Sequence, residues 1–109
     1  MIKWNDFIKV EIRVGTVLEV LEFPEAHNPS YKLKVDFGSH GILKSSAQIT
    51  RLYALDELVG QQVLGVINLP EKQIGPFMSE CLILGIATEP GEVILLQPER
   101  KAPNGYRVS

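Results

Sequence analysis

Alternating apolar and polar positions predict three strands in the first half of the chain. Within residues 10–20, Val10, Ile12 and Val14 alternate with charged residues until Gly15 interrupts the pattern. Residues 31–37 and 42–47 are two further candidate strands. A period of two residues is typical of a half-buried strand. A glycine inside a long strand favours a bulge or a sharp bend, so the first strand is expected to serve two neighbours.

Helical spacing appears in two short places. Leu55, Leu58 and Val59 lie three and four residues apart within residues 54–59, and Gly60 follows as a stop signal. Near the start of the chain, Asn5 is expected to cap a short helical turn by accepting hydrogen bonds from free backbone N–H groups. Both helices are therefore predicted to be short.

The second half of the chain predicts three more strands. Residues 62–69 and 80–87 are apolar runs, and a polar loop that carries Lys72 and Gln73 separates them. Residues 93–97 predict a sixth, short strand, and a polar tail follows. This loop and the two strand ends beside it would bring amide, ammonium and hydroxyl groups to one rim of a sheet, which suits binding better than bond-breaking chemistry.

The order of these elements predicts the fold class. Three strands, a helix and two strands match the OB-fold, an all-β, five-stranded Greek-key barrel. Terminal extensions flank the barrel, and residues 1–109 are expected to form one domain. Because this fold binds oligonucleotides, oligosaccharides and proteins, fold alone does not identify the ligand.

Composition limits the kinds of binding site that the chain can form. The chain has 109 residues, 45% of them hydrophobic, and a formal net charge of -2, so any nucleic-acid site must be a local basic patch. One cysteine, Cys81, excludes an intramolecular disulfide and is expected to be a buried, inert thiol. With two histidines it cannot build a typical structural zinc site. The absence of a signal-like start and of long apolar runs favours a cytoplasmic protein without membrane insertion.

Polar side chains near the expected strand ends make up the candidate binding site. The lysines of residues 31–37 share one strand face and could follow a phosphate backbone, or they could be ordinary solvated lysines that discourage edge pairing. Serine, asparagine and glutamine could bond a ligand or only the local backbone. The candidate rim comprises Lys32, Lys34, Lys44, Ser45, Ser46, Gln48, Asn68, Lys72 and Ser79.

Two further features concern apolar contacts and catalysis. Phe77 and Met78 are expected just before the fifth strand, either as an adaptable apolar patch or as core and dimer contacts. His27 and His40 have no visible nucleophile partner, and neither a serine elbow nor a glycine-rich phosphate loop is present. We therefore expect a protein that is not an enzyme and that has no metal or cofactor.

Several motifs resemble the tRNA-binding domain found in tRNA-binding cofactors and fused to some aminoacyl-tRNA synthetases. Asp6-Phe7 with residues 10–15 is similar to its opening motif, residues 57–63 to its helix-to-strand joint, and residues 66–70 with Ser79-Glu80 to its last barrel strands. Residues 23–26, 44–50 and 73–80 further resemble its secretion-chaperone branch.

This resemblance implies an OB-fold homodimer that binds unfolded or presecretory polypeptides, with tRNA as an alternative ligand. Residues 27–31 and the pair Cys81-Leu82 depart from the tRNA-binding pattern and favour the chaperone branch. The alternative is a structure-specific tRNA-binding module that reads phosphate and 2′-OH groups by shape. Salt separates the two hypotheses, because phosphate contacts weaken steeply as salt rises.

Overall fold

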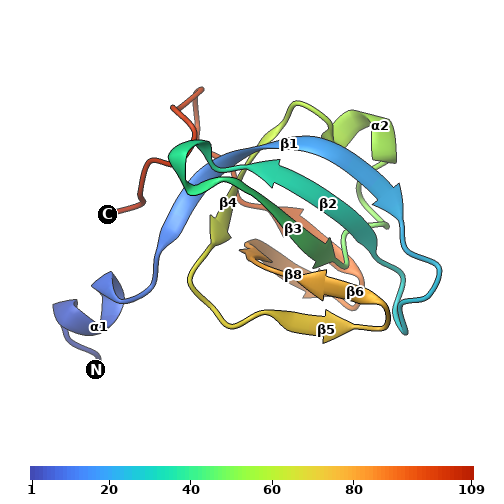
Figure 1. Cartoon of the computed structure of the whole chain (residues 1–109), viewed down its shortest axis with the longest axis horizontal. Helices are drawn as coiled ribbons and strands as arrows, with labels where there is room; N and C mark the ends of the chain where they lie inside the picture. The colour runs from blue at the N-terminus through green and yellow to red at the C-terminus, as the bar shows by residue number, and fades with distance from the viewer.

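A five-stranded antiparallel sheet forms the body of the protein (Figure 1). The computed structural model describes residues 1–109, and the sheet order is β3-β2-β1-β4-β7. Two short hairpins, β5–β6 and β8–β9, are added to it. The elements in chain order are α1 (Trp4–Ile8), β1 (Ile12–Glu22), β2 (Tyr31–Asp36), the 3-10 turn η1 (Gly38–His40), β3 (Ile42–Ala47), α2 (Leu55–Leu58), β4 (Gln62–Val66), β5 (Lys72–Ile74), β6 (Phe77–Ser79), β7 (Leu82–Ile83), β8 (Gly85–Glu89) and β9 (Glu92–Leu95).

β1 is the central strand and it serves two neighbours, as its length predicts. Its first half pairs with β4 and its second half pairs with β2. The predicted irregularity is present, but the register shifts between Val17 and Glu19 rather than at Gly15. Gly15 instead permits close packing, because a Cβ there would lie 2.6 Å from Cγ1 of Val35.

The barrel is nearly closed by residues 79–80, which lie along the outer edge of β3. The Glu80 N–H donates to the Lys44 carbonyl at 2.7 Å, and the Lys44 N–H donates to the Glu80 carboxylate at 2.8 Å. The Ser46 N–H donates to Oγ of Ser79 at 3.2 Å. The prediction of an all-β OB-fold barrel is therefore confirmed.

Apolar side chains from the inner faces of the strands fill the barrel. Val35, Phe37 and Val63 have no exposed surface, and alternate residues of β2 are buried as its sequence pattern predicts. α2 lies between β3 and β4 in the chain and buries Leu58 against this core. The predicted position of this helix is confirmed, although it is shorter than residues 54–59.

The second half of the chain differs from the predicted strands. β4 ends at Val66, not at residue 69, and the expected polar loop contains the hairpin β5–β6. The expected strand over residues 80–87 is divided into β7 and β8, and the expected strand over residues 93–97 is β9, which pairs only with β8. Gly85 begins β8, where a Cβ would lie 2.4 Å from Val93.

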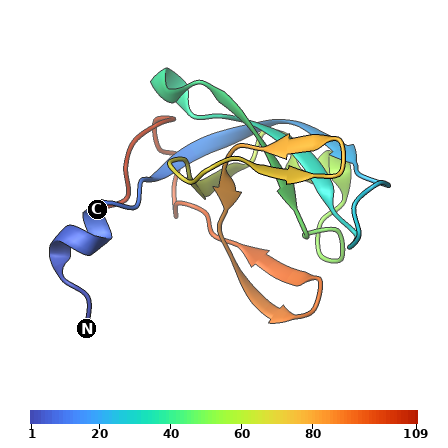
Figure 2. The same cartoon turned by 60° about the horizontal axis from the view of Figure 1, so that its bottom comes forward.

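The terminal segments lie together on one side of the barrel. α1 begins at Trp4, and the Asp6 carboxylate caps it by accepting the Lys3 N–H at 2.9 Å, so the predicted cap at Asn5 is wrong. α1 has no buried residue and stands away from the barrel in both views (Figures 1 and 2). The C-terminal tail runs along β1, where the Val108 N–H donates to the Ile12 carbonyl. None of the helices has the length and apolar character needed to cross a membrane.

Candidate ligand groove and lysine–aromatic face

A groove of about 670 Å³ opens beside the end of β3. It is bounded by the segment before β2, by the residues that follow β3, and by the hairpin β5–β6. Its lining residues are Ala26, His27, Asn28, Ser30, Ser46, Ala47, Gln48, Ile49, Leu69, Pro70, Lys72, Gln73, Ile74, Ser79, Cys81, Leu82, Ile83 and Val93.

The groove combines apolar contacts with polar groups that are almost all uncharged. Half of its 18 lining residues are hydrophobic, and Leu69 and Leu82 are about half exposed. No aspartate or glutamate lines it, and Lys72 is its only lysine. A small set of polar groups around apolar surface is the usual character of a protein binding site.

Four of the predicted rim residues line this groove. They are Ser46, Gln48, Lys72 and Ser79, which the sequence places on different elements. Ser79 already has two partners, because its hydroxyl accepts from the Ser46 N–H and donates to the Cys81 carbonyl at 3.3 Å. Gln48 makes no hydrogen bond through its backbone or its side chain, so its polar groups are free for a ligand.

Ser45 lies inside the barrel rather than at the rim. Its side chain is 1% exposed and its hydroxyl donates to the Cys81 carbonyl at 2.9 Å. The thiol of Cys81 is buried in the same place, as predicted. The pKa of Cys81 is raised to about 12, and burial is the main cause. A hydrogen bond with Ser45 acts to lower this pKa, and the Glu80 carboxylate acts to raise it.

Two lysines and two phenylalanines form a second feature on the outside of β2 and β3, here called the lysine–aromatic cluster. The Lys32 ammonium lies 5.4 Å from the centre of the Phe23 ring, and the Lys44 ammonium lies 5.4 Å from the centre of the Phe77 ring. The two rings meet edge to face with centres 5.4 Å apart. Cation–π and aromatic contacts therefore hold Phe77 of β6 against the barrel.

Lys34 and Met78 lie near this cluster but have other surroundings. Lys34 is directly opposite Lys44 in the β2–β3 register, as the shared strand face predicts. Its ammonium also lies 3.5 Å from the Glu19 carboxylate, an exposed pair of small energetic value. Met78 is half-buried in β6 and is opposite Gln73.

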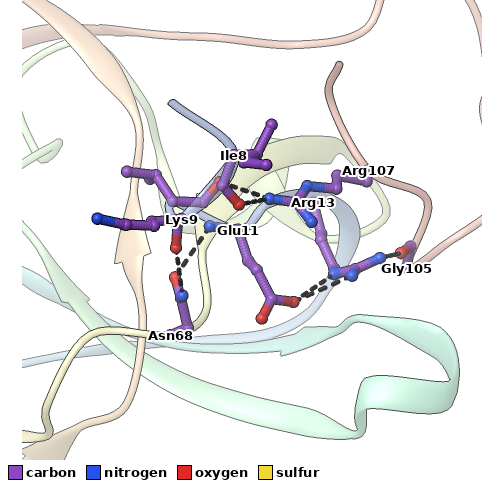
Figure 3. A network of polar contacts seen from close by, with 8 residues as sticks. Ile8, Lys9, Glu11, Arg13, Asn68, Gly105 and Arg107 are labelled. Carbon is purple, nitrogen blue, oxygen red and sulfur yellow. Dashed lines mark hydrogen bonds and ion pairs between the residues drawn. The ribbon is translucent and has the colours of Figure 1, made fainter. Parts of the chain in front are cut away.

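Asn68 joins the N-terminal segment to the end of β4 (Figure 3). Its side-chain amide donates to the Lys9 carbonyl at 2.7 Å, and its oxygen accepts the Glu11 N–H at 2.9 Å. Nearby, Arg13 bonds the Glu11 carboxylate and the Gly105 carbonyl, and Arg107 donates to the Ile8 carbonyl. Asn68 lies outside the groove lining, and both ends of its amide are already used.

Several groove and cluster residues are absent from the predicted set. Phe23 follows β1, Leu69 lies between β4 and β5, and Leu82 belongs to β7. These side chains have no polar group that would mark them, and only the folding of the chain brings them to these places. The aromatic Phe23 next to Pro24 was the one local signal for a packed turn. No cluster of three or more metal-ligating side chains is present.

Comparison with known families gives a match over most of the chain. The model of the putative tRNA binding domain matches residues 12–107. Curated relatives include methionine–tRNA ligases of Porphyromonas gingivalis and Chlorobium chlorochromatii, each 36% identical over 107 residues. The match covers 98% of this chain, but the chain spans only about 15% of the length of these ligases.

Solved structures of similar size also match over the whole chain. The chaperone CsaA of Bacillus anthracis is 45% identical with a TM-score of 0.96, and the matched regions cover 100% of this chain and 99% of CsaA. The CsaA chaperone protein of Picrophilus torridus is 47% identical with a TM-score of 0.91 and full coverage of both chains. A protein of Pyrococcus horikoshii related to methionyl-tRNA synthetase is 27% identical, with a TM-score of 0.87 and coverage of 100% and 98%.

Proposed function

Because the chain belongs to the family of putative tRNA-binding domains, we propose that it is a binding module whose main ligand is unfolded polypeptide. It would hold presecretory chains in the cytoplasm before export, act as a homodimer, and carry out no catalysis of its own. Support comes from the similarity to two CsaA chaperones along the whole chain. The departures at residues 27–31 and 81–82 point in the same direction.

The groove is the observation that carries this proposal. Its volume of about 670 Å³ is in the range of protein ligand sites, and its half-exposed Leu69 and Leu82 offer apolar contact to side chains of any sequence. Its lining contains a single lysine, Lys72, and contrasts with the basic channels that follow nucleic-acid backbones. A segment of unfolded chain with apolar residues fits this combination of surfaces.

Exposed apolar residues of the N-terminal segment support the homodimer. Trp4 is 65% exposed, and Ile8 and Val10 are also exposed although the hydrogen bonds of Asn68 and Arg107 fix their backbone. Large apolar side chains on a positioned surface are typical of interaction sites. Two grooves in one dimer would strengthen the hold on a single chain through effective concentration.

Fluorescence anisotropy with a labelled unfolded presecretory peptide tests the main proposal. We expect binding that persists when the salt concentration is raised, and at least tenfold weaker binding by the double variant Leu69→Ser/Leu82→Ser. Ile42→Ser is the matched control, because Ile42 is similarly exposed and does not line the groove. Absence of peptide binding by the unmodified protein would contradict the proposal.

The lysine–aromatic cluster favours tRNA as a second candidate ligand. Lys32, Lys34 and Lys44 present three cations on one face of β2 and β3, and Phe77 provides a half-buried aromatic ring beside them. Phosphate groups could bind these cations without reading sequence. The groove residue Lys72 lies on the adjoining hairpin.

Titration of labelled bulk tRNA at two salt concentrations tests this second candidate. If tRNA binds there, Lys32→Gln/Lys44→Gln weakens binding several-fold and lowers its salt dependence, while Lys3→Gln/Lys101→Gln leaves both unchanged. These control lysines are exposed and lie outside the cluster. Tight, salt-sensitive tRNA binding without any peptide binding would make tRNA the main ligand.

A further inference from the structure

The outer edge of β3 is covered for only part of its length. In β3, the N–H and carbonyl groups of every second residue point away from β2, toward this outer edge. At Lys44, both of these backbone groups are hydrogen-bonded to Glu80. The Ser46 N–H is bonded to Ser79, and coverage ends there. No strand pairs with β3 on this side, so the Ser46 carbonyl has no strand partner.

Gln48 continues this edge into the groove. It is exposed between the buried residues Ala47 and Ile49, which extends the in-and-out alternation of β3 beyond its last paired residue. Neither its N–H nor its carbonyl has a partner. Three backbone groups in a row, the Ser46 carbonyl and both groups of Gln48, therefore remain available beside the groove, and unpaired strand edges are templates for another chain.

The groove itself suits the side chains of such an added chain. Along a strand, alternate side chains point to opposite faces. One set would contact the apolar lining, which includes Leu69, Ile74 and Leu82, while the other set would face water. Lys72 and the absence of lining carboxylates favour a segment that is neutral or acidic over one rich in lysine and arginine.

We propose that unfolded polypeptide binds this groove as an added β-strand, through backbone hydrogen bonds to the carbonyl of Ser46 and to both backbone groups of Gln48. This inference rests on the proposed polypeptide-binding function and specifies its mode. Backbone bonds give affinity that does not depend on sequence, and the apolar lining selects alternate residues. Segments that are already folded are excluded, because their backbone groups are paired.

A peptide with selectively methylated amides tests this mode of binding. The probe is a labelled ten-residue peptide that alternates Leu with Ser and carries one Glu. Two further versions carry N-methyl groups either on all Leu amides or on all Ser amides. Alternate amides of a strand face opposite edges, so we expect one version to bind at least tenfold more weakly and the other within about threefold of the parent peptide.

Two variants of the protein give an independent measurement. Gln48→Pro removes the N–H as well as the side chain and should weaken binding of the parent peptide at least tenfold, whereas Gln48→Ala removes only the side chain, keeps the N–H, and should weaken binding clearly less. A thermal melt checks that Gln48→Pro is folded. If it is not, the methylated peptides with the unmodified protein still decide the question.

The possible outcomes separate this inference from the proposed function. If the parent peptide does not bind at all, the proposed function fails. If the parent binds and both methylated versions bind equally well, or Gln48→Ala weakens binding as much as Gln48→Pro, strand addition is wrong and polypeptide binding remains. Selective loss with one methylated version, together with a larger loss in Gln48→Pro than in Gln48→Ala, supports strand addition.

Discussion

Two buried serines complete the hydrogen bonds at the point where residues 79–81 close the barrel. The hydroxyls of Ser45 and Ser79 both donate to the Cys81 carbonyl, at 2.9 and 3.3 Å. Buried backbone carbonyls without a partner are costly, and this segment has no complete strand pairing with β3 to supply one. Serine at these positions therefore stabilises the barrel, and its hydroxyl is not free for a ligand.

The Cys81 thiol gives a prediction for alkaline pH. Burial raises its pKa from the ordinary thiol value of 9.0 to about 12, so the folded state keeps a proton that the unfolded state loses. The free energy of unfolding should therefore be unaffected below about pH 9 and fall between about pH 9 and 12, by up to about 1.4 kcal/mol per pH unit from this group. Urea unfolding at a series of pH values measures it.

Cys81→Ala is the comparison that isolates this effect. Burial, followed by the nearby Glu22 carboxylate, also raises the pKa of Tyr31, so the tyrosine adds to the alkaline loss in both proteins. The variant should be less stable at neutral pH, because it leaves a cavity, and should lose less stability as the pH rises. Equal slopes for the two proteins would show that Cys81 is exposed to solvent in the folded state.

At the scale of elements, the hairpin β5–β6 is held by few contacts. Phe77 packs against Phe23 and lies under the Lys44 ammonium, and Ser79 bonds the edge of β3. We expect Phe77→Ala to loosen the hairpin locally, because an aromatic pair contributes about 0.5–1.5 kcal/mol. Amide hydrogen exchange of residues 72–79 should accelerate several-fold, up to about tenfold.

The second hairpin provides the control for that measurement. Ile86→Ala changes an exposed residue of β8, which lies in the separate sheet β8–β9 (Figure 2). It should leave exchange in residues 72–79 unchanged. The same exchange rate in Phe77→Ala and the unmodified protein would mean that the ring contact does not hold the hairpin.

The elements that the sequence predicted well are those with enough residues to show a period. β2 and β3 have six residues each and end at or within one residue of the predicted bounds. β5 and β6 have three residues each, beside Pro70 and Pro76, and three positions cannot establish an alternation. β7 and β8 appeared as one apolar run because Gly85 moves the chain into a different sheet without a polar residue between them.

The sequence indicated which residue types could form the candidate site, but it did not show which of them the fold brings together. The lysines of β2 and β3 share a face, as alternation requires. Asn68 was expected at the ligand rim, but its amide binds the backbone of Lys9 and Glu11, which are far away in the sequence. Local pattern does not reveal such partners, and for the same reason Phe23 and Leu82 were missed.

At the scale of the whole molecule, Trp4 allows a direct test of the homodimer. It is the only tryptophan and it is largely exposed on α1. Dimerisation through α1 should move its emission maximum to shorter wavelength as the protein concentration rises, because the indole leaves water. Light scattering should give twice the chain mass of 12.1 kDa.

Charge at the same surface should separate the subunits. Ile8→Lys places an ammonium next to Trp4 on α1 and should increase the dissociation constant at least tenfold. Ile42→Lys makes the same change at an exposed residue at the start of β3 and should have no effect. A mass of one chain at every concentration would contradict the homodimer.

The pairing of β1 has a consequence for how quickly the protein folds. Ile12 is opposite Val66 of β4, and its carbonyl accepts the N–H of Val108, so the first strand is completed by the last residues of the chain. Such non-local pairing is associated with slow folding, in about milliseconds to seconds. A newly made chain therefore keeps β1 incompletely paired until residues 104–108 arrive. During its own synthesis, this protein passes through the unpaired, apolar state that we propose it recognises in others.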